Sequence, residues 1–106
     1  MIFNIPGHIE MIIAGKKTQT RRVNRGIYQI GKDYAIQRKR GEKAIEGYRI
    51  KILSLWRENT FTFSKYDANA EGGYTQEEYE KIFLKLNPEI DKSLGWWSFK
   101  FKVIEV

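Results

Sequence analysis

The chain has 106 residues, of which 42% are hydrophobic and 14% aromatic, a composition that predicts a single globular domain over residues 1–106 and excludes a disordered chain. It contains no cysteine and one histidine, which excludes disulfides and thiolate chemistry, and its carboxylates are scattered, so we expect neither a metal site nor a cofactor. Nineteen Lys and Arg against thirteen Asp and Glu give a net charge of +6, which favours a phosphate-bearing partner such as RNA or a nucleotide.

The first predicted element is a short amphipathic helix within Pro6–Gly15. Its apolar residues recur at helical spacing on one face, at Ile9, Ile12 and Ile13. Gly15 suits the left-handed position just past a helix end, and His8 near the start is interpreted as a surface or capping residue. The next seven residues, Lys16–Arg22, contain four cations and two hydroxyls without an acid. From Thr18 onward they favour a strand, so the basic stretch is predicted to cover a helix-to-strand turn.

The middle of the chain predicts strands joined by turns. Turns are expected at Asn24–Gly26 and Gly31–Asp33, a strand at Tyr34–Gln37, a hairpin tip at Arg38–Lys43 and a longer strand at Ile45–Trp56. The apolar positions of the longer strand change phase at Leu53 and Leu55, which indicates either a bulge or a strand covered on both faces. Phe61 and Phe63 resemble a brief strand or edge.

Two helices and a closing strand follow. Ser64 with Asp67 marks a possible helix start, and Thr75–Glu78 has the pattern of a capping box. The second helix repeats apolar residues at Tyr79, Ile82, Phe83 and Leu86, and ends at Asn87-Pro88. Trp97–Ile104 alternates apolar and polar residues and is predicted as a strand. The whole order predicts an α+β, mainly β, fold, in which two or three helices attach to a small barrel.

The basic stretch can carry chemistry if an acid joins it. A threonine hydroxyl such as that of Thr20 needs a base, and Lys17 can serve if burial and neighbouring cations lower its pKa. Because Lys17 and Thr20 are three residues apart, they would face opposite ways on one strand, so Lys17 must precede the strand. The best acid candidate is Glu71, beside Gly72 and Gly73, which imply a sharp turn or a close approach. Its alternative role is to end the short helix at the surface.

A family resemblance supports this site. Gly15–Arg22 resembles the signature of the ASCH domain family, and Ala70–Gly72 before an amphipathic helix is similar in order and distance. The aromatic-rich closing strand is similar as well. Within the family, the pattern of Lys17-Thr18, Thr20 and Arg22 is most similar to that of the small bacterial N(4)-acetylcytidine amidohydrolases. The resemblance implies a PUA-like β-barrel with a cleft between barrel and helices.

The resemblance also implies roles for individual residues. Lys17 would be the general base, Thr20 the nucleophile and Glu71 the proton donor to the leaving amine, while Arg22 would orient the substrate or support the site. We add three further substrate-binding candidates, Lys16, Arg21 and Tyr74. The two cations, Lys16 and Arg21, are expected to act from the surface. The chain departs from the amidohydrolase pattern at Arg21, where those enzymes have an apolar residue, and at Gly73, which resembles an insertion after the acid.

Three function classes remain open. The first is an amidohydrolase acting on a modified nucleoside. The second is a PUA-like RNA-binding module, possibly with ribonuclease activity, in which Arg38, Lys39 and Arg40 grip phosphates and Trp96, Trp97 or Tyr74 stacks on a base, although core packing is the simpler role for at least one tryptophan. The third, an adaptor for an acidic protein, has no specific support. No apolar run approaches the ~20 residues of a membrane span, so we expect no membrane partner, a cytoplasmic location and a monomer.

Overall fold

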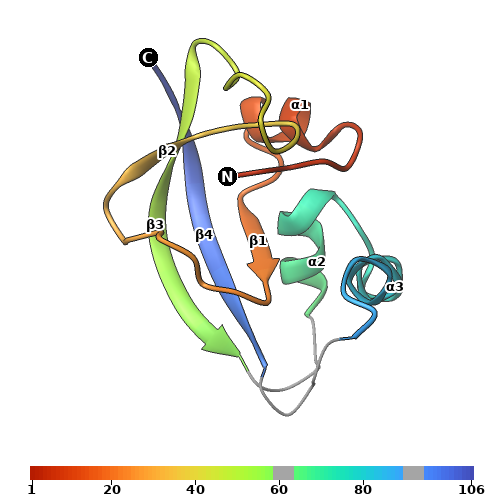
Figure 1. The fold of residues 1–106 in the computed structure, drawn as a ribbon. Helices are drawn as coiled ribbons and strands as arrows, with labels where there is room; N and C mark the ends of the chain where they lie inside the picture. Colours follow the sequence, from red (N-terminus) through yellow and green to blue (C-terminus); the bar gives the residue numbers. More distant parts are fainter. Residues whose placement is uncertain (59–63, 90–94) are drawn as a thin grey trace.

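The structure, a computed structural model, describes residues 1–58, 64–89 and 95–106. In chain order its elements are α1 (His8–Ile13), β1 (Gln19–Arg22), β2 (Asp33–Ala35), β3 (Tyr48–Glu58), α2 (Lys65–Gly72), α3 (Gln76–Leu86) and β4 (Trp96–Glu105). Figure 1 shows the long strands β3 and β4 running through the molecule, with α2 and α3 on the side of β1. Among the described residues, no helix is long and apolar enough to cross a membrane.

The strands form one antiparallel sheet in the order β1-β4-β3-β2. The segment after β2 also pairs with the start of the chain, because the Phe3 amide donates to the Gln37 carbonyl at 2.9 Å and the Gln37 amide donates to the Met1 carbonyl at 3.0 Å. This bridge extends the sheet beyond β2 and brings the N-terminal segment against it. The predicted α+β, mainly β, fold with attached helices is therefore confirmed.

The change of phase in β3 is a β-bulge. Ile52 lies opposite Phe101, but Ser54 lies opposite Lys100, so Leu53 is the extra residue of β3 at this point. Leu53 is 41% exposed, whereas Leu55 packs against the same core as Ile52. One extra residue inverts the alternation of a strand, and the bulge thereby returns Leu55 to the buried face. Of the two interpretations of the pattern, the bulge is correct.

Two apolar clusters make up the core. The larger lies between the sheet, α1 and the N-terminal segment, and contains Met1, Phe3, Ile9, Ile12, Ile36, Ile50, Ile52, Phe99 and Phe101. The smaller joins α2, α3 and the start of β4, and contains Ala68, Tyr79, Phe83 and Trp96. Trp96 is 1% exposed, so it is a core residue and not a surface on which a base can stack.

Several predicted boundaries shift by a few residues. Asp33 begins β2 instead of ending a turn. The strand predicted from Ile45 begins only at Tyr48, because the chain turns at Gly47 with φ +83°. Ile45 itself makes one backbone hydrogen bond, to the carbonyl of Ile36. The capping box predicted at Thr75 is present, and the helix start predicted at Ser64 is a capping box as well. The predicted strand around Phe61 and Phe63 lies outside the described residues.

The two glycines after Glu71 have different reasons to be glycine. Gly73 ends α2 with φ +76°, a left-handed conformation that residues with a Cβ rarely adopt. Gly72 is closely approached, since a Cβ there would lie 2.9 Å from Cε2 of Tyr74 and 3.1 Å from Nε2 of His8. The pair therefore turns the chain and lets α1 approach the end of α2.

We expect Gly72→Ala to disrupt the packing of His8 against Tyr74 and to lower the free energy of unfolding by about 1–3 kcal/mol, the usual cost of overpacking. Gly73→Ala should cost about 1–2 kcal/mol through backbone strain alone. Urea unfolding measures both losses. The NMR signal of His8 should move only in Gly72→Ala, and an unchanged His8 signal in that variant would contradict the close approach.

Candidate functional site

A cavity of about 240 Å³ lies where the N-terminal segment, β1 and the helices α2 and α3 meet. Its polar wall consists of Asn4, His8, Lys17, Thr20, Arg21, Arg22, Glu71, Tyr79 and Asn87. Its apolar wall consists of Ile2, Phe3, Ile5, Val23, Ile82, Phe83 and Leu86. The three residues predicted as catalytic, Lys17, Thr20 and Glu71, thus line one cavity although about fifty residues separate Thr20 from Glu71 in the sequence.

The turn after α1 places Lys17 before β1, as the site requires. Gly15 adopts φ +74°, and the amides of Lys16 and Lys17 both donate to the Met11 carbonyl, at 2.8 and 3.1 Å. This reversal points two adjacent lysines in different directions. Lys17 is 3% exposed and lines the cavity, whereas Lys16 is exposed and does not line it. The structure thus brings Lys17 to the candidate site and leaves Lys16 outside it.

Lys17 is held by both the main chain and the carboxylate of Glu71. Its Nζ donates to the carbonyl of Gln19 at 3.0 Å, to the carbonyl of Glu71, and to Oε2 of Glu71 at 3.2 Å. Glu71 lies near the end of α2 and is 2% exposed, so the alternative that it ends the helix at the surface is wrong. Lys17 and Glu71 form an ion pair almost wholly shielded from water.

Burial moves the two pKa values of this pair toward each other. It lowers the pKa of the Lys17 ammonium, an effect that the negative charge of Glu71 opposes. It raises the pKa of the Glu71 carboxyl, although Lys17 and Arg21 oppose this shift and the Tyr79 hydroxyl hydrogen-bonds the carboxylate. Both shifts favour the uncharged forms, so they narrow the pKa difference that opposes proton transfer from Lys17 to Glu71.

The hydroxyl of Thr20 faces the guanidinium of Arg22. Arg22 Nε donates to Thr20 Oγ1 at 3.4 Å, its Nη2 donates to the carbonyl of Ile2, and the group lies 5.1 Å from the centre of the Phe3 ring. Burial lowers the pKa of Arg22, yet a guanidinium keeps its proton at neutral pH. Among the described residues no carboxylate forms an ion pair with Arg22, so its positive charge is left for a ligand of the cavity.

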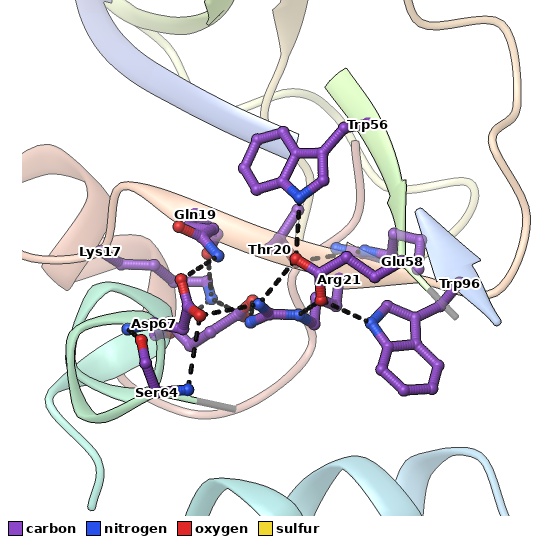
Figure 2. A network of polar contacts seen from close by, with 11 residues as sticks. Lys17, Gln19, Thr20, Arg21, Trp56, Glu58, Ser64, Asp67 and Trp96 are labelled. Carbon is purple, nitrogen blue, oxygen red and sulfur yellow. Dashed lines mark hydrogen bonds and ion pairs between the residues drawn. The ribbon is translucent and has the colours of Figure 1, made fainter. Parts of the chain in front are cut away.

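Arg21 corrects the prediction of a surface cation. Its side chain has no exposed area, and it binds the carboxylates of Glu58, Asp67 and Glu71. Figure 2 shows the first two of these contacts. Arg21 Nε donates to Oε2 of Glu58 at 3.2 Å, and its Nη2 donates to Oε1 of Glu58 at 3.1 Å. The same Nη2 lies 3.3 Å from Oδ2 of Asp67, and Arg21 Nη1 lies 3.4 Å from Oε1 of Glu71. Edge strand β1 thus directs Gln19 and Arg21 toward α2, and Thr20 and Arg22 the other way.

His8 is a site residue that sequence analysis missed. It is 5% exposed instead of lying on the surface, it lines the cavity, and its Nε2 lies 2.6 Å from the hydroxyl of Tyr74. Tyr74, predicted to bind substrate, contacts His8 but does not itself line the cavity. A signal was available, because His8 precedes Ile12 by four residues and so falls on the buried stripe of α1.

The candidate RNA-binding cations lie away from the cavity wall. Arg38, Lys39 and Arg40 are all exposed, and two of them already have acidic partners: Arg38 pairs with Glu10 at 3.1 Å, and Lys39 with Glu42 at 3.5 Å. In the described part of the chain, no group of three or more His, Asp or Glu side chains could hold a metal ion.

Comparison with known proteins identifies the fold. No family model and no curated protein matches the sequence. Among solved structures, the ASCH domain from Lactobacillus crispatus JV V101 is 19% identical with a TM-score of 0.66, over 93% of this chain and 71% of that one. The chain has the fold of an ASCH domain. Hypothetical protein PH0355 is 21% identical with a TM-score of 0.72, over 97% and 96% of the two chains.

A third structure, protein EF3133 from Enterococcus faecalis V583, is 20% identical with a TM-score of 0.59, over 91% of this chain and 69% of that one. At these identities the similarity concerns the fold and leaves the function to be argued from the site. The ASCH fold confirms the architecture that the motif at Gly15–Arg22 implied. The cavity lies between sheet and helices, where the resemblance implied a cleft.

His8 provides a direct test of the cavity wall, since it is the only histidine in the chain. Burial, together with the positive charges of Lys17 and Arg22, lowers the pKa of His8 to about 4 from an ordinary value of 6.5. We therefore expect its ring signals in proton NMR to stay unchanged from pH 8 to pH 5.5 and to titrate only near pH 4.

The same shift makes stability depend on pH. Between about pH 6.5 and 4 the unfolded chain binds a proton that folded His8 does not, so stability falls as the pH falls, by up to about 1.4 kcal/mol per pH unit. Urea unfolding at pH 7 and pH 5 measures the loss, and His8→Gln should reduce it. A His8 titration near pH 6.5 would show that the imidazole is exposed to water.

Proposed function

We propose that this protein hydrolyses the acetyl amide of N(4)-acetylcytidine or of a closely related acylated nucleoside. The observation that supports this most strongly is that Thr20, the buried Lys17–Glu71 pair and Arg22 all line one cavity, in which Arg22 Nε donates to Thr20 Oγ1. Amide hydrolysis needs a nucleophile, a base, an acid and a cation for the oxyanion. The motif resemblance at Gly15–Arg22 supports the same substrate class.

In the first step, Thr20 Oγ attacks the carbonyl carbon of the acetyl group while neutral Lys17 takes the hydroxyl proton. The neutral form of Lys17 is available because its proton can rest on Glu71, 3.2 Å away. The carbonyl oxygen becomes an oxyanion, and Arg22, whose Nε is 3.4 Å from Thr20 Oγ1, is the nearby cation able to stabilise it. The result is a tetrahedral intermediate on Thr20.

In the second step, the bond between the carbonyl carbon and N4 breaks. Protonated Glu71 gives its proton to N4, so cytidine leaves as a neutral amine and an acetyl ester remains on Thr20. Water, deprotonated by the Glu71 carboxylate, then attacks the ester and releases acetate, and the proton held by Lys17 returns to Thr20. The sum is one amide and one water giving one amine and one carboxylic acid.

The size and walls of the cavity suit a single nucleoside. Its volume of about 240 Å³ is below the ~300–1,000 Å³ of sites for drug-sized ligands, which favours a base-sized group over a folded polymer. Apolar side chains from the N-terminal segment and α3, including Phe3, Ile5 and Ile82, offer surfaces against which a planar base can pack.

We expect the purified protein to release cytidine and acetate from N(4)-acetylcytidine. Lys17→Met, Thr20→Val and Glu71→Gln should each lower kcat by at least ~100-fold, since each removes a group that carries a proton or forms the covalent bond. Chromatography of the nucleoside products measures turnover.

The control is Lys102→Met, which removes a lysine that is exposed on β4 and should leave kcat unchanged. Circular dichroism checks that each variant is folded. Wild-type protein that turns over no acylated nucleoside would disprove the proposed activity, and full activity in Thr20→Val would disprove the covalent route.

A second candidate function is binding of single-stranded RNA, and one feature of the molecule favours it. Trp97 is half-buried near the start of β4, and the guanidiniums of Arg25 and Arg57 lie 5.5 and 5.6 Å from the centre of its ring. An aromatic ring flanked by exposed cations combines a surface for base stacking with partners for phosphates. This cluster supports RNA binding better than Arg38 and Lys39, because it combines cations with an aromatic ring.

If RNA binds at Trp97, the affinity for a short single-stranded RNA should fall steeply between 50 and 200 mM salt. Arg25→Met combined with Arg57→Met should weaken binding about tenfold or more, whereas neutralising Arg38, Lys39 and Arg40 together should weaken it less. Fluorescence anisotropy measures binding, and electrophoresis of the same samples detects any cleavage. Salt-independent or absent binding would exclude this function.

A further inference from the structure

We propose that Arg21 is a positioning residue for the candidate reaction: it fixes the orientation of the Glu71 carboxyl and, as a permanent cation beside it, sets the pH range in which Glu71 and Lys17 exchange their proton. This inference rests on the roles proposed above for Lys17 and Glu71. It assigns Arg21 a part in the site that differs from both substrate binding and a surface charge.

The two oxygens of the Glu71 carboxyl have different partners. Oε1 lies 3.4 Å from Nη1 of Arg21, and Oε2 lies 3.2 Å from Nζ of Lys17. The carboxyl group cannot rotate about its own axis without losing one of these contacts. Oε2, the oxygen that receives the lysine proton, is therefore kept on the side of Lys17, and Arg21 keeps it there without touching that proton itself.

Arg21 is itself held on the side away from Glu71. Glu58 at the end of β3 grips it with both oxygens, and Glu58 in turn accepts from the indole nitrogens of Trp56 at 2.8 Å and Trp96 at 3.2 Å (Figure 2). These contacts connect Glu71 to β3 and β4. A planar guanidinium with several fixed partners loses little freedom on binding, which suits a group that must hold another in place.

Asp67 gives Arg21 a second anchor. Its carboxylate lies 3.3 Å from Nη2 of Arg21, accepts from Gln19 Nε2 at 3.2 Å, and completes the capping box of α2 through the amide of Ser64 at 3.4 Å. Glu71 and Asp67 lie four residues apart, one turn of α2, so Arg21 binds the start and the end of the same short helix. The position of Glu71 along α2 is thereby tied to β1.

The charges around Glu71 determine the sign of the electrostatic effect. The groups that face it are Lys17 before β1, Arg21 and Arg22 on β1, Tyr79 on α3, and the His8–Tyr74 pair beyond Gly72. Tyr79 and Tyr74 are held neutral, because burial raises the pKa of each, and His8 is neutral at pH 7 because its pKa is about 4. Arg21 and Arg22 are therefore the permanent cations acting on the Lys17–Glu71 pair, and the carboxylates of Glu58 and Asp67, which also bind Arg21, offset part of its field.

A permanent cation favours loss of a proton from both members of the pair. Removing the charge of Arg21 must therefore raise the apparent pKa values of Glu71 and Lys17 together. For a charge at this distance the rise should be about 1 pH unit or more. A group with a merely structural role would lower activity or stability without moving both values in the same direction.

The test compares the dependence of kcat/KM on pH in wild-type protein, Arg21→Met and Arg21→Lys. In Arg21→Met both limbs of the profile should move to higher pH by about one unit or more, and kcat at the new optimum should fall. In Arg21→Lys the charge remains but the fork is lost, so kcat should fall while the limbs stay close to those of the wild type. An unshifted profile in folded Arg21→Met overturns the proposal.

Two further measurements separate the effect of Arg21 on Glu71 from a loss of folding or of activity. Because Arg21→Met leaves Glu58 buried without its partner, the double variant Arg21→Met/Glu58→Gln removes both charges and keeps an oxygen acceptor for the two indoles. It should shift the profile in the same direction but by less, because loss of the Glu58 carboxylate offsets part of the loss of Arg21. Carbon NMR titration of Glu71 and Lys17, assigned with Glu71→Gln and Lys17→Met, reports the pair without any turnover. If the protein has no hydrolase activity but the titration shifts as expected, the proposed function is disproved and the effect of Arg21 on the Lys17–Glu71 pair stands. An unshifted titration overturns that effect.

Discussion

The burial of charge beside β1 is the constraint on which the rest of the structure depends. Lys17, Arg21 and Glu71 are each no more than 5% exposed. An isolated buried ion costs several kcal/mol even after relaxation, and removing one partner of a buried pair is strongly destabilising. The three groups are tolerable only together, with the carboxylates of Glu58 and Asp67 around them. Helix α2 therefore has to lie against β1, and the cavity forms where this polar contact meets the apolar walls.

Several local features serve that contact. The left-handed turn at Gly15 lets Lys17 point inward while Lys16 stays in solvent. The pair Gly72-Gly73 ends α2 directly after Glu71 and allows His8 and Tyr74 to approach its last turn, where a Cβ would collide. The amide of Thr18 also donates to the carbonyl of Ala70 at 2.9 Å, a main-chain bond that joins the start of the β1 segment to α2 beside the buried pair. Backbone geometry, and not side-chain charge alone, brings Glu71 to Lys17.

The elements of the fold could be predicted because their signals are local. Helix α3 combines a capping box with apolar residues at 3.6-residue spacing, and β4 alternates apolar and polar residues from Trp97 to Val103. The motif at Gly15–Arg22 led to the cavity and to Lys17, Thr20 and Glu71. Arg21 was misjudged because its sequence neighbours are polar, and its carboxylate partners come from β3 and α2, whose position relative to β1 no local pattern reveals. His8 was misjudged because the buried face of the short helix was assigned from its isoleucines alone, and a single polar residue was assumed to lie at the surface.

The balance of charge around the cavity also bears on the ligand. Among the cations that line the cavity, Arg21 is paired with Glu58 and Asp67, and Lys17 with Glu71, whereas Arg22 has no ion pair with a carboxylate among the described residues. A phosphate would be attracted to Arg22 equally before and during a reaction, and such uniform binding does not accelerate chemistry. A neutral acetamide gains its negative charge only when Thr20 adds to the carbonyl. One unpaired guanidinium beside that hydroxyl therefore stabilises the transition state of an uncharged substrate more than its ground state. This difference favours an acylated base as the group that enters the cavity and leaves phosphates, if the ligand carries them, outside it.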